Sequence, residues 1–178
     1  EGTLGFISEI TYRTVPEYAN KASALILFEN IETACRAVTR LKSAPVAAAE
    51  LADRAALRSV EGKPGLPESI GALGPGGAAL LVETRAADSN TLAAQVLEIQ
   101  QSLAEIHTVE PVHFSTDAQE CARLWNVRKG MFPSVGAMRE VGTTVIIEDV
   151  TFPLPCLAEA TLDLQRLLDA HGYPDAII

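Results

Sequence analysis

The strongest constraint on the fold is a continuous apolar run at residues 22–29, with the sequence ASALILFE. A run of this length is too short to cross a membrane and is typical of a buried strand. Asn30 follows the run directly and is a favoured N-cap residue, which predicts a helix from Ile31 to about Lys42. The chain is therefore expected to contain a buried strand followed at once by a helix.

Hydrophobic periodicity and clusters of glycine and proline divide the rest of the chain. These signals predict further strands at residues 5–12, 78–84, 108–114 and 144–152, and helices at 45–60, 89–106, 116–130 and 156–171. Ser89 or Asn90 is the expected cap of the helix at 89–106, Gly172 is expected to end the last helix, and residues 62–77 are expected to form a loop. Strands that alternate with helices indicate an α+β domain in two layers, with a mixed sheet related to the ferredoxin-like fold and one open sheet face. A doubly wound parallel sheet is the alternative.

Composition and charge argue against several classes of partner. The 178 residues are 48% hydrophobic, which suffices for one globular domain, and their formal net charge of -9 argues against nucleic acid and anionic membranes as partners. No stretch approaches the roughly 18 apolar residues of a transmembrane segment, and the N-terminus lacks a signal-peptide pattern. Cys35, Cys121 and Cys156 are widely spaced and odd in number, so we expect free thiols in a cytoplasmic protein.

Two patterns that often carry chemistry are expected to be structural here. The glycine-rich turn at 74–77 precedes a predicted strand rather than a helix, so the helix N-terminus that would complete a phosphate site is missing. The three histidines, His107, His113 and His171, match no metal-ligand or catalytic spacing. We therefore expect a plain loop and structural or exposed histidines, and no metal site.

Arg128 is the best candidate for a ligand-binding side chain. It follows Trp125 by three positions on a predicted helix, so the two side chains share a face. An arginine held beside an aromatic ring can bind a carboxylate through two parallel hydrogen bonds. The simpler interpretation is an arginine in a surface salt bridge.

Two adjacent acids, Glu148 and Asp149, lie inside a predicted apolar strand. Neighbouring residues of a strand point to opposite faces, so at least one carboxylate is directed toward the layer interface and needs a partner there. The simpler interpretation is an ion pair with a basic residue of another domain.

Four segments together resemble one family of flavoenzymes. They are EGTLGFISE at residues 1–9, DRAAL at 53–57, LWNVR at 124–128 and EDVTFP at 148–153. In order and spacing these segments are similar to motifs of the FAD-linked oxidases of the vanillyl-alcohol oxidase type, from end to end of the chain. Within that family the chain looks most like the D-lactate, glycolate and D-2-hydroxyglutarate dehydrogenases.

The resemblance implies a domain assignment. Residues 1–16 correspond to the end of the family's FAD-binding domain, and residues 17–178 to its C-terminal substrate-side domain, the cap. The family's G-H-x-x-x-G-N-x-H segment, with its metal-binding and catalytic histidines, would begin after Ile178. We therefore expect both ends of the chain to be cuts in a longer protein.

The resemblance also assigns roles to particular residues. Arg128 matches the family arginine that binds the substrate carboxylate, whereas Gly2, Thr3, Gly5 and Ile7 match backbone positions along the flavin. No residue of the chain matches a catalytic or metal-binding position of the family. The position that is a lysine in some hydroxyglutarate-specific relatives is Ile147 here, which puts that route to a second carboxylate in doubt.

In the full-length parent the family relationship implies oxidation of a D-2-hydroxy acid to the 2-oxo acid, with FAD as hydride acceptor. The same relationship allows an iron–sulfur cluster and a divalent metal outside this chain, and a cytoplasmic or membrane-peripheral location. The chain alone is expected to be inactive, to hold no FAD without the missing FAD-binding domain, and to form homodimers through apolar surface exposed at its ends. The alternatives are a free-standing α+β ligand-binding or regulatory domain and a self-contained enzyme.

Overall fold

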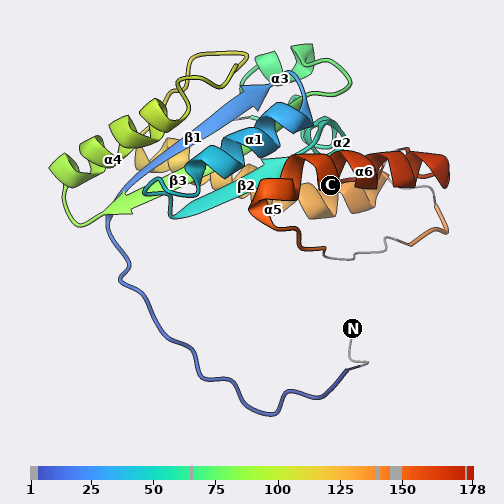
Figure 1. The fold of residues 1–178 in the computed structure, drawn as a ribbon, viewed down its shortest axis with the longest axis horizontal. Helices are drawn as coiled ribbons and strands as arrows, with labels where there is room; N and C mark the ends of the chain where they lie inside the picture. Colours follow the sequence, from blue (N-terminus) through green and yellow to red (C-terminus); the bar gives the residue numbers. More distant parts are fainter. Residues whose placement is uncertain (1–3, 65, 139–140, 145–149, 175) are drawn as a thin grey trace.

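The computed structural model describes residues 4–64, 66–138, 141–144, 150–174 and 176–178. Its centre is a three-stranded sheet in the order β1-β3-β2, formed by β1 (Asn20–Phe28), β2 (Ala48–Ala52) and β3 (Ala78–Ala86) (Figure 1). Both pairs of strands are antiparallel. The predicted α+β class is confirmed, while the described strands form an antiparallel sheet and neither the mixed nor the doubly wound parallel one.

The predicted strand–helix unit is the most accurately anticipated part of the fold. Strand β1 covers the apolar run and pairs along its whole length with β3, from Asn20 opposite Ala86 to Phe28 opposite Ala78. Helix α1 (Ile31–Leu41) follows, and the side chain of Asn30 accepts a hydrogen bond of 2.8 Å from the backbone N–H of Thr33. The predicted N-cap is therefore confirmed.

The helix predicted at residues 45–60 is wrong. Residues Ala48–Ala52 form strand β2, and only the short α2 (Arg54–Arg58) follows it. The sequence is rich in alanine and favours a helix locally, but pairing with the central strand overrides this preference. The backbone N–H of Ala47 begins the pairing with a 2.8 Å bond to the carbonyl of Glu83.

The strands predicted at residues 5–12 and 108–114 are also absent. Residues 5–12 form no strand and are exposed along an extended segment that projects away from the sheet (Figure 1). Residues 108–115 lie beside β1 without forming a ladder. Their backbone bonds to β1 at Val109, which donates to Leu27, and at an isolated bridge between Ser115 and Ser23. Pro111 lies between these contacts and has no backbone N–H to offer.

The remaining helices depart from the predicted bounds mainly at their ends. Helix α4 (Ser89–Ser102) begins after Asp88, whose side chain caps it in place of the expected Ser89 or Asn90. Helix α5 (Ala118–Met138) continues through Pro133, since a proline removes one helical hydrogen bond without preventing the helix on either side. The expected loop at 62–77 contains the short α3 (Ser69–Ala72).

The C-terminal part of the described chain is a short 3-10 turn, η1 (Leu154–Cys156), followed by α6 (Leu157–Ala170). Gly172 has a φ of +86° just beyond the end of α6, which confirms the predicted C-terminal glycine. Of the strand predicted at 144–152, residues 145–149 lie outside the described residues, and residues 144 and 150–152 are not in a strand.

Helices cover both faces of the sheet, so the expectation of one open face is wrong. Helices α1, α4 and α6 lie over one face, where Ile26, Phe28 and Leu80 form the centre of the larger apolar core. Helices α2, α3 and α5 lie over the other, and Leu27 packs there with Leu57. We call this second side the α5 face. None of the helices in the described ranges is long and apolar enough to cross a membrane.

Replacing the cap residue Asn30 with alanine should lower the free energy of unfolding by about 1 kcal/mol, because a helix N–H group loses its acceptor. Urea denaturation of the two proteins measures the difference. Asn126→Ala is a matched control at an exposed position inside α5, where we expect a change within about 0.5 kcal/mol. Equal losses in the two variants would contradict the capping role of Asn30.

Candidate functional site

The side chains of Trp125 and Arg128 both extend from α5 to the sheet. The indole Nε1 of Trp125 donates a hydrogen bond of 3.3 Å to Ser23 Oγ on β1. Arg128 Nη2 donates one of 2.9 Å to Glu50 Oε2 on β2. Because β1 and β2 are the two outer strands, these contacts tie α5 to both edges of the sheet.

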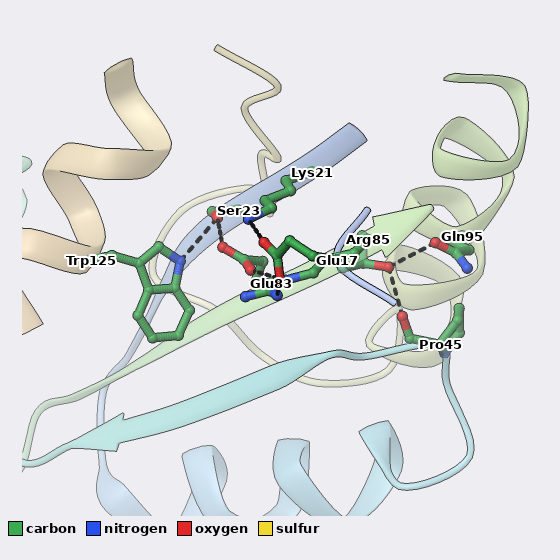
Figure 2. A network of polar contacts seen from close by, with 9 residues as sticks. Glu17, Lys21, Ser23, Pro45, Glu83, Arg85, Gln95 and Trp125 are labelled. Carbon is green, nitrogen blue, oxygen red and sulfur yellow. Dashed lines mark hydrogen bonds and ion pairs between the residues drawn. The ribbon is translucent and has the colours of Figure 1, made fainter. Parts of the chain in front are cut away.

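A buried carboxylate lies next to the Trp125 contact. Ser23 Oγ donates a 3.2 Å hydrogen bond to Glu83 Oε2, and Arg85 Nε donates one of 2.5 Å to Glu83 Oε1 (Figure 2). The Glu83 side chain is 4% exposed, whereas that of Arg85 is 33% exposed. The hydrogen bond from Arg85 to the Glu83 carboxylate raises the pKa of the Arg85 guanidinium above its ordinary value. The buried charge of Glu83 is therefore compensated by a cation that reaches solvent.

The same network continues to the base of the N-terminal segment. Arg85 Nη1 lies 2.9 Å from Glu17 Oε2, and Lys21 forms an ion pair with the other carboxylate oxygen of Glu17 (Figure 2). The hydrogen bond from Lys21, and then the charge of Arg85, lower the pKa of Glu17. Glu17 thus joins the exposed segment to the sheet.

In the part of the chain that the structure describes, three acids pair with three cations on or beside the sheet strands of the α5 face. Glu17 binds Lys21 and Arg85, Glu83 binds Arg85, and Glu50 binds Arg128. The Arg128–Glu50 pair is open to solvent, with side chains 49% and 39% exposed. Its guanidinium is therefore accessible to a carboxylate that arrives from solution.

A groove of about 390 Å³ lies beside β1 and is lined by this strand, by the segment 110–115 and by the first turns of α5. Its lining includes Ser23, Leu25 and Leu27 from the strand and Leu124 from the helix. The groove thus has an apolar wall and, at Ser23, borders the polar network.

The three histidines lie apart from one another in the fold. His107 Nε2 is 3.6 Å from Glu29 Oε1, His113 lines the groove, and His171 follows the end of α6. Within the described ranges, no group of three or more His, Cys, Asp or Glu side chains is placed to hold a metal ion.

The other residues singled out from the sequence fall in three places. Gly5 and Ile7 lie in the exposed N-terminal segment, and a side chain added at Gly5 would meet no atom within 4 Å. Gly2 and Thr3 lie outside the described residues, as do Ile147, Glu148 and Asp149. At the 74–77 turn, a Cβ added at Gly77 would come within 2.8 Å of Leu73 Cβ, so this glycine permits a close turn before β3.

Burial shifts two titratable groups that have structural roles. The Asp53 carboxylate caps α2 by accepting from the N–H of Ala56, and it also accepts from that of Ile178. Burial is the main cause that raises its pKa. Burial likewise raises the pKa of the Cys35 thiol, which contacts Thr161. Cys35, Cys121 and Cys156 are all free thiols, as expected.

The sequence did not lead us to the residues that the sheet contributes to these polar contacts, namely Ser23, Glu50, Glu83 and Arg85. One available signal was a lone glutamate, Glu83, inside the apolar run of the central strand. A carboxylate in such a position needs a compensating partner, which indicates a polar cluster nearby. Glu50 gave no comparable signal, because its segment was predicted to be helical.

The fold and this face define a class of protein: a small α+β domain with a charged cluster between its sheet and a long helix. Residues 17–178 match the family model described as FAD linked oxidases, C-terminal domain. The chain belongs to this family. It is also similar to the glycolate oxidase subunit GlcD of Bacillus subtilis (strain 168), at 29% identity over 157 residues. That match covers 86% of this chain and 31% of the relative.

Proposed function

We propose that this chain is the substrate-side domain of a longer flavoprotein that oxidises a D-2-hydroxy acid of the lactate, glycolate or 2-hydroxyglutarate type to the 2-oxo acid. Its membership of the FAD-linked oxidase C-terminal family supports a flavin-dependent redox reaction in the parent. The likeness to a glycolate oxidase subunit supports a small 2-hydroxy acid as substrate.

The observation that carries the proposal is the position of Arg128. Its guanidinium is half exposed on the α5 face, where Glu50 is the acid that contacts it in the described part of the chain. A guanidinium has five N–H donors in a fixed plane, so one contact leaves donors for a ligand carboxylate. Trp125, one helical turn earlier, holds this part of α5 against β1.

Oxidation of a 2-hydroxy acid needs a cation for the carboxylate, a base or metal for the hydroxyl group and a hydride acceptor. FAD would supply the hydride acceptor when bound in the parent protein. Residues 4–10 are exposed, and a side chain added at Gly5 would meet no atom within 4 Å, so there is open space beside this segment. In our proposal the chain binds and orients the carboxylate through Arg128, and Gly2, Thr3, Gly5 and Ile7 would lie along a flavin held by another domain.

Arg128→Ala in the intact flavoprotein should lower kcat/KM for the 2-hydroxy acid by about 10–150-fold, the worth of a charge-assisted carboxylate pair. Arg128→Lys keeps the charge but loses the planar pair of donors, so it should fall between alanine and the parent. Steady-state kinetics measure both effects, and flavin absorbance should stay unchanged in both variants.

Arg36→Ala is the matched control for this experiment. Arg36 forms an exposed ion pair of 2.7 Å with Glu32 in α1, which lies over the opposite face of the sheet. Its removal should leave kcat/KM within about twofold of the parent. If Arg128→Ala also stayed within this range, Arg128 would not bind the substrate carboxylate.

A further inference from the structure

We propose that Glu50 is an exchangeable counter-ion for Arg128: it occupies the guanidinium in the substrate-free protein, is displaced by the substrate carboxylate, and then disfavours substrates that carry a second carboxylate. The inference rests on the proposed role of Arg128 and adds a specificity-determining residue to it. Its starting point is the single 2.9 Å contact between Arg128 Nη2 and Glu50 Oε2.

Among the three acids that pair with Lys21, Arg85 and Arg128, Glu50 has the fewest contacts that restrain it. Glu83 is 4% exposed and accepts hydrogen bonds from both Ser23 and Arg85. Glu17 is bound by two cations, Lys21 and Arg85. The Glu50 side chain is 39% exposed and contacts one cation in the described ranges, so its carboxylate can return to water at little cost.

Displacement is favoured because the substrate carboxylate can bind the Arg128 guanidinium more strongly than the Glu50 carboxylate does. An exposed single-contact ion pair contributes little, since water solvates both charges and the side chains lose rotational freedom. A small acid that binds the planar guanidinium through two parallel hydrogen bonds gains more from the same cation. Glu50 therefore weakens substrate binding modestly without preventing it.

The backbone keeps the displaced carboxylate close to the ligand. Glu50 lies in the middle of β2, opposite Leu81 of the central strand, so its Cα cannot move away. Its neighbours on the same face of β2 are Ala48 and Ala52, whose small side chains leave room for the glutamate to change rotamer. Like charges within a few ångströms repel, so a second substrate carboxylate would meet an unfavourable field here.

The test is Glu50→Gln in the intact flavoprotein, which keeps the size of the side chain and removes its charge. The Michaelis constant for glycolate or D-lactate should fall about two- to fivefold, with kcat unchanged. For D-2-hydroxyglutarate the Michaelis constant should fall by at least a further factor of about two, because a repulsion is lost as well. For an acid that is not turned over, the inhibition constant replaces the Michaelis constant.

Two controls isolate the contact between Glu50 and Arg128. Glu32→Gln removes the same charge from a similar exposed pair with Arg36. It should leave the Michaelis constants for the monocarboxylates and for D-2-hydroxyglutarate unchanged. In an Arg128→Ala background, Glu50→Gln should lose its effect on the monocarboxylate, because no guanidinium remains to be released.

The outcomes separate this inference from the proposed function. If Arg128→Ala leaves the kinetics unchanged, the proposed carboxylate site is wrong, whatever Glu50 does. If Arg128→Ala weakens turnover but Glu50→Gln leaves or raises the Michaelis constant for the monocarboxylate, Glu50 is not an exchangeable counter-ion. An equal improvement for mono- and dicarboxylates would overturn the selectivity part of the inference.

Discussion

Replacing Phe28 with alanine should lower the free energy of unfolding by about 3–5 kcal/mol, the largest effect on stability that we predict. The Phe28 side chain is fully buried at the end of β1, in the core beneath α1. Its truncation removes apolar area from the core and leaves a cavity that the surrounding strand and helix cannot close. A domain of this size typically has a stability of about 5–15 kcal/mol, so the variant should unfold at a much lower urea concentration.

The same substitution at Phe6 provides the matched control. Phe6 is 93% exposed in the N-terminal segment, so Phe6→Ala removes the same atoms without opening a cavity. We expect its free energy of unfolding to stay within about 0.5 kcal/mol of the parent. A loss at Phe6 as large as that at Phe28 would show that the segment packs against the domain in solution.

Arg85→Met should lower the free energy of unfolding by about 3 kcal/mol, because it leaves the buried carboxylate of Glu83 without its cation. The hydrogen bond from Ser23 remains, but a hydroxyl group cannot compensate a full charge in a site that is 4% exposed. The methionine retains much of the apolar stem of the arginine, so the expected loss reflects charge rather than packing. Urea denaturation at neutral pH measures it.

The double variant Arg85→Met/Glu83→Gln distinguishes a charge effect from general damage to β3. The amide can still accept from Ser23 and carries no charge, so the pair of substitutions should recover most of the lost stability. Arg40→Met is the control for an exposed pair, since Arg40 lies 3.2 Å from the exposed Glu105, and should cost less than about 1 kcal/mol. Failure of the double variant to recover would place the damage in packing.

Elements with strong local signals were predictable from sequence. Neighbouring residues alone predict strand β1, the Asn30 cap and helix α1. They also predict strand β3, which follows Gly77. Strand β2 was not predictable in this way, because Ala48–Ala52 becomes a strand through pairing with residues about thirty positions later. Residues 5–12 have the alternating pattern of a strand, but they form no strand because none of the described strands pairs with them.

In the candidate site, too, some residues could be predicted from local sequence and others could not. Trp125 and Arg128 are one helical turn apart, so their common direction could be inferred from helix geometry alone. Their partners Ser23 and Glu50 lie 102 and 78 residues away in the sequence, and the order of the strands brings them beneath α5. Local pattern therefore identified the arginine as a candidate, and only the fold identified the glutamate that pairs with it.

The irregular segment beside β1 also determines how much of the sheet edge is open to another chain. A nine-residue apolar strand at the edge of a sheet is a template on which another chain can add a strand and begin an aggregate. Val109 and Ser115 occupy hydrogen-bonding positions near both ends of that edge, at Leu27 and Ser23. This segment forms no fourth strand, but it covers the β1 edge of the sheet. The opposite edge is β2, which has only five residues and carries the charged Glu50.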